Sequence, residues 1–391
     1  MEKNVRRPVA LLIAACVLLF LTIHLLQRSS PLHLSGYNTY TLQAMRWRQG
    51  AVALEKDYPH LELAKFEGKY YVSFPPVPTL PIFLLTFLFG ENVPGVILVQ
   101  LYALGACLLL YLLLSRHMPP THAAVWSFLG CFGSSLLALL QDGAVWYQAQ
   151  TLALLLTAAA LERMDKDKPT AALLFYALSV GCRPFNALYG PLIIALFMLR
   201  HSDVKGALRR LVPGVLLGLG VAFLLGAYNY VRFGNVFEFG HNYLPEFSTQ
   251  GGTQFSLRHL ANNARTFLWG GPFSGTDSGG LQLKEFGFSL FLANPLLLCM
   301  VFWVLRDVIR GNMTPDKALT AAFFLIHAAL LLCHRTGGGY QYGARYWVDC
   351  LPYGFLYLSQ IRRRAWDAAA MLPLGMGLVM AVYGACMIRL P

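Results

Sequence analysis

The sequence predicts an all-α protein that crosses a membrane many times. Hydrophobic residues make up 56% of the 391 residues and charged residues only 13%, a balance that ordinary soluble domains do not have. The apolar residues also gather in long runs, and a helix needs about 20 of them to span a hydrocarbon core of roughly 30 Å. Two long polar segments, at about 28–77 and 231–285, interrupt these runs.

About eleven runs are apolar enough to be membrane spans, and their lengths allow about ten to thirteen. The runs are Pro8–Gln27, Pro94–Leu114, Ala123–Leu140, Val145–Leu161, Pro169–Cys182, Pro184–Leu199, Leu211–Tyr230, Phe286–Leu305, Ala318–Cys333, Tyr346–Ser359 and Ala368–Met387. The first is interpreted as a retained helix, because it is long and no small-x-small cleavage site follows it. We therefore expect one membrane-embedded domain over residues 1–391.

The basic residues predict the orientation of the chain. Short turns on one side of the predicted spans hold 17 of the 31 Lys and Arg residues: Lys3, Arg6, Arg7, Arg116, Arg163, Lys166, Lys168, Arg200, Lys205, Arg209, Arg210, Arg306, Arg310, Lys317, Arg362, Arg363 and Arg364. The positive-inside rule places these turns and the N-terminus in the cytoplasm, and both long segments outside. The net charge of +12 is then explained by the membrane topology and by contact of the basic turns with anionic lipid headgroups. It does not indicate nucleic acid, because no soluble segment interleaves basic and aromatic residues.

Metal and disulfide frameworks have no support in the sequence. The eight cysteines are scattered, with no CxxC pair and no His/Cys ligand spacing. The outer segments contain no DxD-like pair, so no metal ligand is predicted and metal dependence stays open.

The first outer segment contains three local patterns. Tyr37–Arg48 has aromatic residues at helical spacing, which predicts a helix lying flat on the membrane surface with its aromatics at headgroup depth. Gly68–Val72 predicts a short strand or an extended arm. Three prolines between positions 75 and 78 then force an extended turn, and Leu80–Phe89 is expected to be a re-entrant or surface helix.

The other outer segments combine glycine with aromatic and basic residues. The second segment opens with Arg232–Tyr243, in which glycines alternate with aromatic and polar residues. A third, shorter segment at 335–345 contains Gly337-Gly338-Gly339 and ends at Arg345. Consecutive glycines allow the backbone to approach a ligand closely.

These segments, in this order and on one predicted side, resemble the C-type membrane glycosyltransferases. That class uses polyprenyl-phosphate sugars and includes protein O-mannosyltransferases and the lipid A aminoarabinose transferase, and the chain looks most like its bacterial members. The resemblance rests on the first helix and long first loop, and on Gly68–Pro78, Arg183-Pro184, Arg232–Asn235 with Phe239-Gly240, and Gly343–Tyr346 with Leu351-Pro352.

The resemblance implies an enzyme of the bacterial cytoplasmic membrane. It would take a sugar from a polyprenyl-phosphate carrier in the outer leaflet and pass it, with inversion, to a glycan, lipid or protein acceptor of the cell envelope. No cofactor is implied beyond this donor. The family usually carries a catalytic carboxylate soon after the first helix, whereas Ser35-Gly36-Tyr37-Asn38 has none. The base would then be Asp57 or Glu62, or would be absent.

The chemistry of sugar transfer suggests roles for the other candidates. A carboxylate suits deprotonation of the acceptor hydroxyl, and Arg or Lys stabilises the charge that develops on the phosphate. We expect Arg183 and Arg345, with Tyr346 and Lys69, to bind the donor phosphate, and His241 to be a possible substrate contact.

Each assignment has a plain structural alternative. The arginines could reach the membrane interface or pair with Asp349 or Asp142. The carboxylates, Lys69 and His241 could be ordinary solvated loop residues.

Two other function classes share this composition. A transporter or flippase of lipid-linked sugars would be expected to show charges within the membrane or two inverted halves, and neither is clear in the sequence. A non-catalytic subunit of an envelope complex is favoured by the missing early acid.

Overall fold

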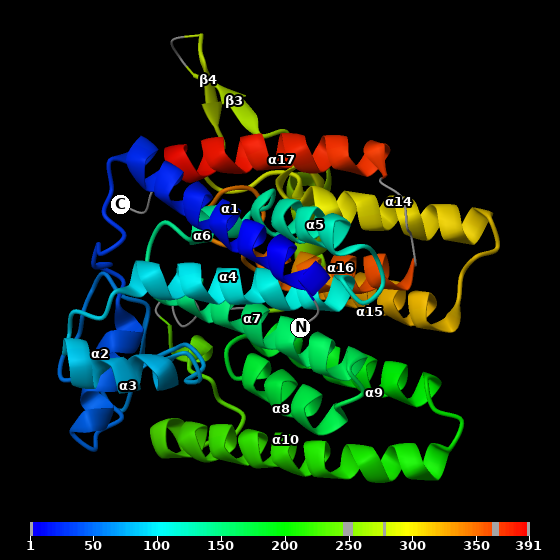
Figure 1. The fold of residues 1–391 in the computed structure, drawn as a ribbon. Coiled ribbons are helices and arrows are strands. Elements are labelled where there is room, and N and C mark those ends of the chain that lie inside the picture. The colour runs from blue at the N-terminus through cyan, green and yellow to red at the C-terminus, as the bar shows by residue number, and fades with distance from the viewer. Residues whose placement is uncertain (1–2, 245–252, 277–278, 362–366, 389–391) are drawn as a thin grey trace.

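The chain folds into a bundle of roughly parallel helices with loop structure gathered at one end (Figure 1). The structure is a computed structural model that describes residues 3–244, 253–276, 279–361 and 367–388. The bundle helices are α1 (Lys3–Gln27), α4 (Gly95–Leu114), α5 (Pro120–Phe132), α7 (Val145–Asp165), α8 (Pro169–Val180), α9 (Tyr189–Leu199), α10 (Val204–Phe233), α14 (Pro295–Ile309), α15 (Pro315–Cys333), α16 (Leu351–Gln360) and α17 (Ala368–Met387). A mainly helical architecture is thereby confirmed.

Five helices of the described part of the chain are long and apolar enough to cross a membrane, namely α1, α4, α10, α15 and α17. Their outward surfaces carry large apolar side chains, among them Leu18, Leu216, Phe223 and Val379. Apolar faces of this extent are unfavourable in water and are typical of helices that contact lipid. The membrane location predicted from composition is therefore supported by the packing.

Each predicted apolar run contains a helix, but two runs differ from the prediction. Ala123–Leu140 is broken, because α5 ends at Phe132 and only the short α6 (Leu136–Leu139) follows. Gly133 lies at this break, and a Cβ atom there would come 2.9 Å from the Leu374 carbonyl oxygen of α17. Phe286–Leu305 becomes helical mainly from Pro295 onward, because the backbone of Asn294 before this proline is not helical.

The first long segment folds against the loop end of the bundle, at the left in Figure 1. It contains α2 (Thr39–Arg48) and an antiparallel hairpin of β1 (Leu63–Phe66) and β2 (Lys69–Val72), in which Leu63 pairs with Val72. α3 (Thr79–Phe89) follows. The expected helices and strand are confirmed. The placement expected for the face of α2 is wrong, however, since Tyr40 and Ala44 are fully buried against protein rather than at headgroup depth.

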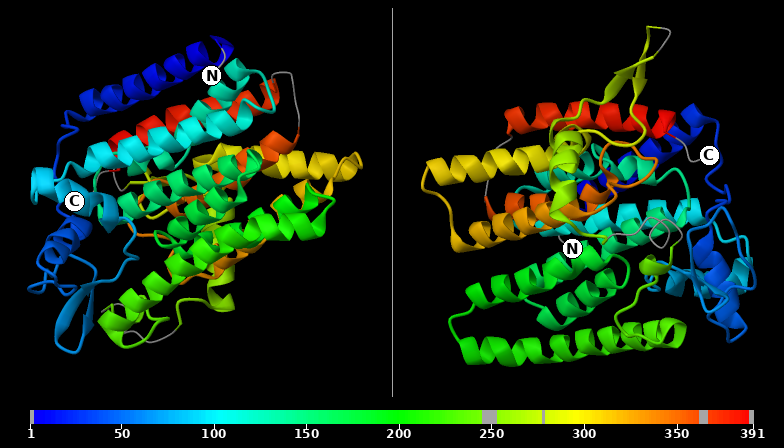
Figure 2. Two further views of the ribbon diagram at one scale, coloured as in Figure 1. Left: turned by 60° about the horizontal axis from the view of Figure 1, so that its bottom comes forward. Right: turned by 180° about the vertical axis from the view of Figure 1, so that it is seen from behind.

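The second long segment lies at the same end and includes a projecting hairpin. It runs through η2 (His241–Tyr243), η3 (Leu257–His259) and α12 (Leu260–Trp269) to the antiparallel strands β3 (Phe273–Gly275) and β4 (Leu281–Leu283). This hairpin stands out beyond α17, roughly at right angles to the long helices (Figures 1 and 2). Two 3₁₀ turns, η1 (Pro184–Leu188) and η4 (Arg345–Cys350), lead into α9 and α16.

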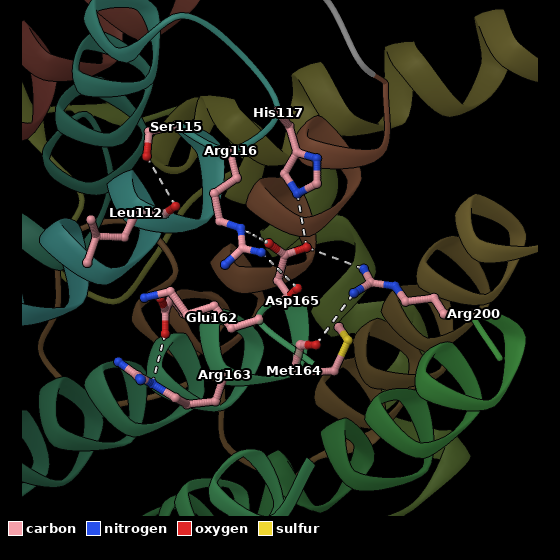
Figure 3. A network of polar contacts seen from close by, with 10 residues as sticks. Leu112, Ser115, Arg116, His117, Glu162, Arg163, Met164, Asp165 and Arg200 are labelled. Atoms are coloured by element: carbon pink, nitrogen blue, oxygen red, sulfur yellow. Dashed lines mark hydrogen bonds and ion pairs between the residues drawn. The ribbon is translucent and has the colours of Figure 1, made fainter. Parts of the chain in front are cut away.

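The opposite end of the bundle is held by ion pairs (Figure 3). The carboxylate of Asp165, at the end of α7, lies 3.0 Å from Arg116, 2.9 Å from His117 and 3.5 Å from Arg200. Nearby Glu162 pairs with Arg163 and Lys166. These contacts join the α4–α5 turn, α7 and the end of α9.

Candidate functional site

A cavity of about 940 Å³ opens at the loop end of the bundle. Its walls come from both long segments, from the start of α7, from the α8–η1 junction and from η4. Residues separated by up to three hundred positions therefore meet in one space. Most of the residues expected to act on a donor line this cavity, whereas two do not.

Arg183 enters the cavity from the junction of α8 and η1. Its backbone is extended because Pro184 follows, and this turns the side chain away from the helix direction. Nε donates a hydrogen bond of 3.0 Å to Oδ2 of Asp349, and Nη2 lies 2.9 Å from the same oxygen. Asp349 in turn accepts a bond of 3.1 Å from Gln150. The pairing considered from sequence is thus present, and it fixes Arg183 at the cavity wall.

Arg345 lines the same cavity and forms no ion pair with the described residues, although the charge of Asp349 acts on it from a greater distance. Only 6% of the residue is exposed, and its backbone is fixed by Gln341 and Gln150. In the described part of the chain its side chain forms no ion pair and no hydrogen bond, and Nε is buried without a partner. Its guanidinium lies instead over the rings of Tyr346, Trp146 and Tyr147, at 5.2, 5.8 and 5.9 Å.

A buried guanidinium with aromatic neighbours alone is costly, because cation–π contacts replace only part of its lost hydration. Arg232, another buried arginine, shows how such a charge is normally satisfied. It donates bonds of 2.7 Å to the Val72 carbonyl and to Asn229, and so fastens the first loop to α10. Arg345 makes no comparable contact and faces the cavity.

Tyr346 brings the two cavity arginines together. The Arg183 guanidinium lies 4.8 Å from the centre of its ring and that of Arg345 lies 5.2 Å from it. Both cations therefore border one aromatic surface of one cavity. An anion bound there would meet the N–H groups of Arg345 and those of Arg183 that Asp349 does not engage.

The two predicted base candidates are placed differently. Glu62 lines the cavity and accepts a hydrogen bond of 3.0 Å from the indole nitrogen of Trp146. Asp57 is not among the cavity residues, and its carboxylate forms an ion pair of 2.6 Å with Lys65 of β1. A second carboxylate at the cavity, Glu238, accepts bonds from Gly240 and Asn242 within its own loop.

The position of the missing early acid adjoins a carboxylate from elsewhere in the chain. Tyr37 lines the cavity with its ring 5.1 Å from that of Trp146. Ser35, just before it, hydrogen-bonds to Asp142 of the α6–α7 connection. Burial raises the pKa of the Asp142 carboxyl above its ordinary value. Asp142 approaches His33 at 3.9 Å and is not the partner of either cavity arginine.

Two histidines border the cavity as neutral groups. Burial lowers the pKa of His241 to about 4, and nearby His334 and Arg183 add to the effect. Burial also lowers the pKa of His334, whose Nδ1 contacts the Thr336 carbonyl at 2.7 Å. Neutral imidazole offers one donor and one acceptor, which suits contact with sugar hydroxyls.

Lys69 lies outside the cavity. It is exposed at the start of β2, opposite Phe66 of β1, and does not line the space between the arginines. The cavity thus brings Glu62, Arg183, Arg345, Tyr346 and His241 together and leaves Asp57 and Lys69 outside. Among the described residues, no group of three His, Cys, Asp or Glu side chains lies close enough to hold a metal ion.

The cavity also contains residues that the sequence did not indicate, among them Trp146, Tyr147, Glu238 and His334. Trp146 and Tyr147 begin an apolar run and read as interface aromatics. Glu238 lies where glycine and phenylalanine alternate in the second segment. This pattern indicates a functional region but does not single out Glu238.

Comparison with known proteins gives similarity in structure only. No protein-family model matches the chain, and no curated protein matches its sequence. The crystal structure of the apo Archaeoglobus fulgidus oligosaccharyltransferase matches with a TM-score of 0.56 at 13% identity, over 97% of this chain and 56% of that chain. The same archaeal protein, AglB, in complex with an inhibitory peptide and a dolichol-phosphate, matches with the same values.

ArnT from Cupriavidus metallidurans bound to undecaprenyl phosphate matches with a TM-score of 0.53 at 14% identity, over 91% of this chain and 60% of that chain. The chain thus spans little more than half the length of the solved proteins it matches. Identities this low establish the architecture alone. The chain has the fold of the C-type membrane glycosyltransferases, which is the fold that its sequence resemblance predicts.

Proposed function

We propose that the protein is a membrane glycosyltransferase. It moves a sugar from a polyprenyl-phosphate donor to a hydroxyl group of a cell-envelope acceptor, on the outer side of a bacterial cytoplasmic membrane. The observation that carries the proposal is Arg345, a buried cation that faces a cavity and lacks an anionic partner in the described part of the chain. An enzyme that binds a lipid phosphate needs such a cation free before the donor arrives.

In this proposal the donor phosphate lies between Arg183 and Arg345 over the ring of Tyr346. Arg183 is held by Asp349 and keeps its remaining donors for the phosphate, whereas Arg345 contributes its whole guanidinium. The apolar cavity residues Phe185, Leu188 and Leu330, on η1 and α15, provide a surface for the start of the isoprenoid chain.

Glu62 is the better candidate for the general base, since it reaches the cavity and Asp57 does not. An acceptor hydroxyl oxygen attacks the anomeric carbon and forms the new C–O bond. The bond from that carbon to the phosphate oxygen breaks, and its electron pair stays on the phosphate facing the arginines. The hydroxyl proton passes to the Glu62 carboxylate. Glu238 is the second carboxylate within the cavity and is the alternative base.

The orientation in the membrane is part of the proposal. The loop end carries the cavity, and the opposite end carries Arg116, Arg163, Lys166 and Arg200, all counted toward the cytoplasmic excess of basic residues. An acceptor would reach the cavity from water, and the donor would reach it from the outer leaflet.

The test is sugar transfer by the purified protein from a panel of synthetic polyprenyl-phosphate sugars, with envelope extract as the source of acceptor. Released polyprenyl phosphate measures turnover. We expect Glu62→Gln to lower the rate at least about 100-fold, the usual range for loss of a general base. Asp57→Asn is the matched control, because it neutralises a carboxylate of the same loop outside the cavity, and it should retain the wild-type rate.

The outcomes separate the alternatives. Equal rates for Glu62→Gln and wild type, with a loss in Glu238→Gln, would move the base to Glu238. Loss in Asp57→Asn alone would contradict the placement of the base. If the wild-type protein consumes no donor but moves a fluorescent lipid-linked sugar across vesicles, it is a transporter. If it does neither, the remaining class is a non-catalytic envelope subunit.

A further inference from the structure

A second cavity, of about 770 Å³, lies between α12 and the β3–β4 hairpin. The proposed transfer does not use it. Two backbone hydrogen bonds of 2.9 Å hold its walls together, from Lys284 to the Pro272 carbonyl and from Ser289 to the Gly270 carbonyl. The Glu285 backbone carbonyl also accepts a bond from Gln341, which links this cavity to the segment that borders the first one.

The second cavity contains two cations for which the described residues provide no partner. Arg265 of α12 and Lys284 beside β4 both line it, and neither forms an ion pair or a side-chain hydrogen bond with the described residues. Glu285 is the acid among the lining residues, and its carboxylate accepts the Tyr340 hydroxyl at 3.3 Å. The lining is completed by uncharged polar groups such as Asn262, Thr266 and Gln282. This lining is suited to an anion with several acceptor oxygens.

Large apolar side chains stand exposed at and beside this cavity. Trp269 is 81% exposed and Phe286 is 69% exposed, and both line the cavity, while Leu281 of β4 is 76% exposed. These three belong to a segment whose opposite side is packed, since Phe267 of α12 and Leu283 of β4 are buried. Exposed aromatics beside cations are typical of the membrane interface, where the ring meets acyl chains and the cation meets headgroups.

The place of the cavity in the fold favours a lipid over a soluble ligand. The hairpin projects from the flank of α17, roughly at right angles to the long helices and hence along the membrane plane (Figures 1 and 2). Phe273 of β3 packs on Tyr383 near the end of α17, with ring centres 6.5 Å apart. α17 is long and apolar enough to span the membrane, so the hairpin leaves the bundle at the level of one interface.

We infer that this cavity binds the phosphate-bearing headgroup of an anionic phospholipid, with Arg265 and Lys284 on the phosphate and Trp269, Leu281 and Phe286 beside the acyl chains. One lipid accounts for both the unpaired cations and the apolar rim. The inference is independent of the proposed transfer, since a transporter or an inactive subunit would hold the same lipid.

The test is equilibrium binding of phosphatidylglycerol to the purified protein in detergent. The variant Arg265→Gln with Lys284→Gln should bind it at least about tenfold more weakly, because each cation near an anionic headgroup contributes about 1 kcal/mol. The matched control, Arg258→Gln with Lys56→Gln, removes two charges outside the cavity and should bind like wild type. Arg345→Gln should also bind like wild type, which separates this site from the donor site.

Two further measurements complete the test. Brominated phosphatidylglycerol should quench the fluorescence of the wild-type protein more than that of Trp269→Phe. Equal binding by the double variant and its control would overturn the inference, as would equal affinity for phosphatidylcholine. Displacement by millimolar inorganic phosphate would instead assign the cavity to a free anion and would also overturn it.

Discussion

The two ends of the bundle use charge in different ways. At the end shown in Figure 3 the buried carboxylates Glu162 and Asp165 are matched by cations on neighbouring turns, and Asp307 is likewise matched by Arg306 and Lys317. At the loop end a buried cation, Arg345, forms no ion pair with the described residues, and its guanidinium lies over aromatic rings. The first arrangement joins helices, whereas the second, in the proposed function, keeps a charge available for a ligand.

This difference indicates which buried charges serve the fold and which are candidates for function. A buried charge that forms an ion pair inside the fold serves the structure. Removing one member of such a pair is destabilising, because the other charge is left uncompensated in a medium of low dielectric constant. A buried charge without a partner lowers stability, and such sites persist where function requires them. Arg183 lies between these cases, because it is matched by Asp349 and still borders the cavity.

The largest effect is expected on stability at the loop end, from Asp349→Asn. The asparagine has no negative charge, and its NH₂ group would face the N–H donors of either Arg183 or Gln150. The buried guanidinium of Arg183 would then lack a counter-charge. Loss of one partner of a buried pair costs about 3–5 kcal/mol, so the midpoint of thermal unfolding in detergent should fall by several degrees or more. An unchanged midpoint would mean that the Arg183–Asp349 pair does not hold this end together.

The next largest effect is expected on the rate of sugar transfer, without a loss of stability. Arg345→Gln should lower sugar transfer about 100-fold, because the developing phosphate charge loses one of its two arginines, while the unfolding midpoint stays the same or rises. Transfer and melting are measured on the same preparation. A variant that loses both together would assign Arg345 to the fold rather than to the donor.

A smaller effect is expected from Asp165→Asn at the opposite end. Arg116, His117 and Arg200 are each partly open to solvent, so they can regain hydration when the carboxylate is neutralised. The cost should be about 1 kcal/mol, seen as a modest fall in the unfolding midpoint, with transfer per folded molecule unchanged. A hundredfold loss of transfer would break the distinction between the two ends.

The smallest effect at neutral pH is expected at His241 and appears only on acidification. The pKa of His241 is about 4 in the folded protein, against an ordinary value of 6.5. Between these pH values the His241 imidazole is protonated in the unfolded chain and stays neutral in the folded protein. The free energy of unfolding therefore falls as pH decreases from 6.5 to 4. His241→Gln should lose less stability than wild type over this range and match its pH dependence above pH 6.5. If the unfolding midpoints of wild type and His241→Gln fall equally between pH 7 and pH 5, the burial of a neutral imidazole at position 241 is contradicted.

Much of the fold follows from local sequence patterns. Apolar runs long enough to cross a membrane became helices, and Lys69–Val72 became a strand. The errors came from tertiary contacts that no window of sequence contains. Gly133, at the end of α5, lies directly against α17, and Tyr40 is buried against Phe74 and Pro75 of the connection between β2 and α3.

The sequence indicated the cations that line the cavity more clearly than its carboxylates. Arg183 and Arg345 were notable in sequence because a charge beside an apolar run needs a reason. Asp57 and Glu62 are equivalent in sequence, five residues apart in one loop. In the structure Asp57 pairs with Lys65 outside the cavity, whereas the indole of Trp146 holds Glu62 at the cavity wall. Glu238 and His334 reach the cavity only through the course of the second and third segments, which local patterns do not determine.

The central claim, that Arg345 is held open for a lipid phosphate, is tested most directly by the affinity for polyprenyl phosphate itself. Binding is measured for wild type, Arg345→Gln and Arg200→Gln, where Arg200 is a matched cation of the opposite end. The account predicts binding at least about tenfold weaker for Arg345→Gln, from loss of charge-assisted hydrogen bonds, and unchanged binding for Arg200→Gln. Equal affinity in all three proteins would contradict it.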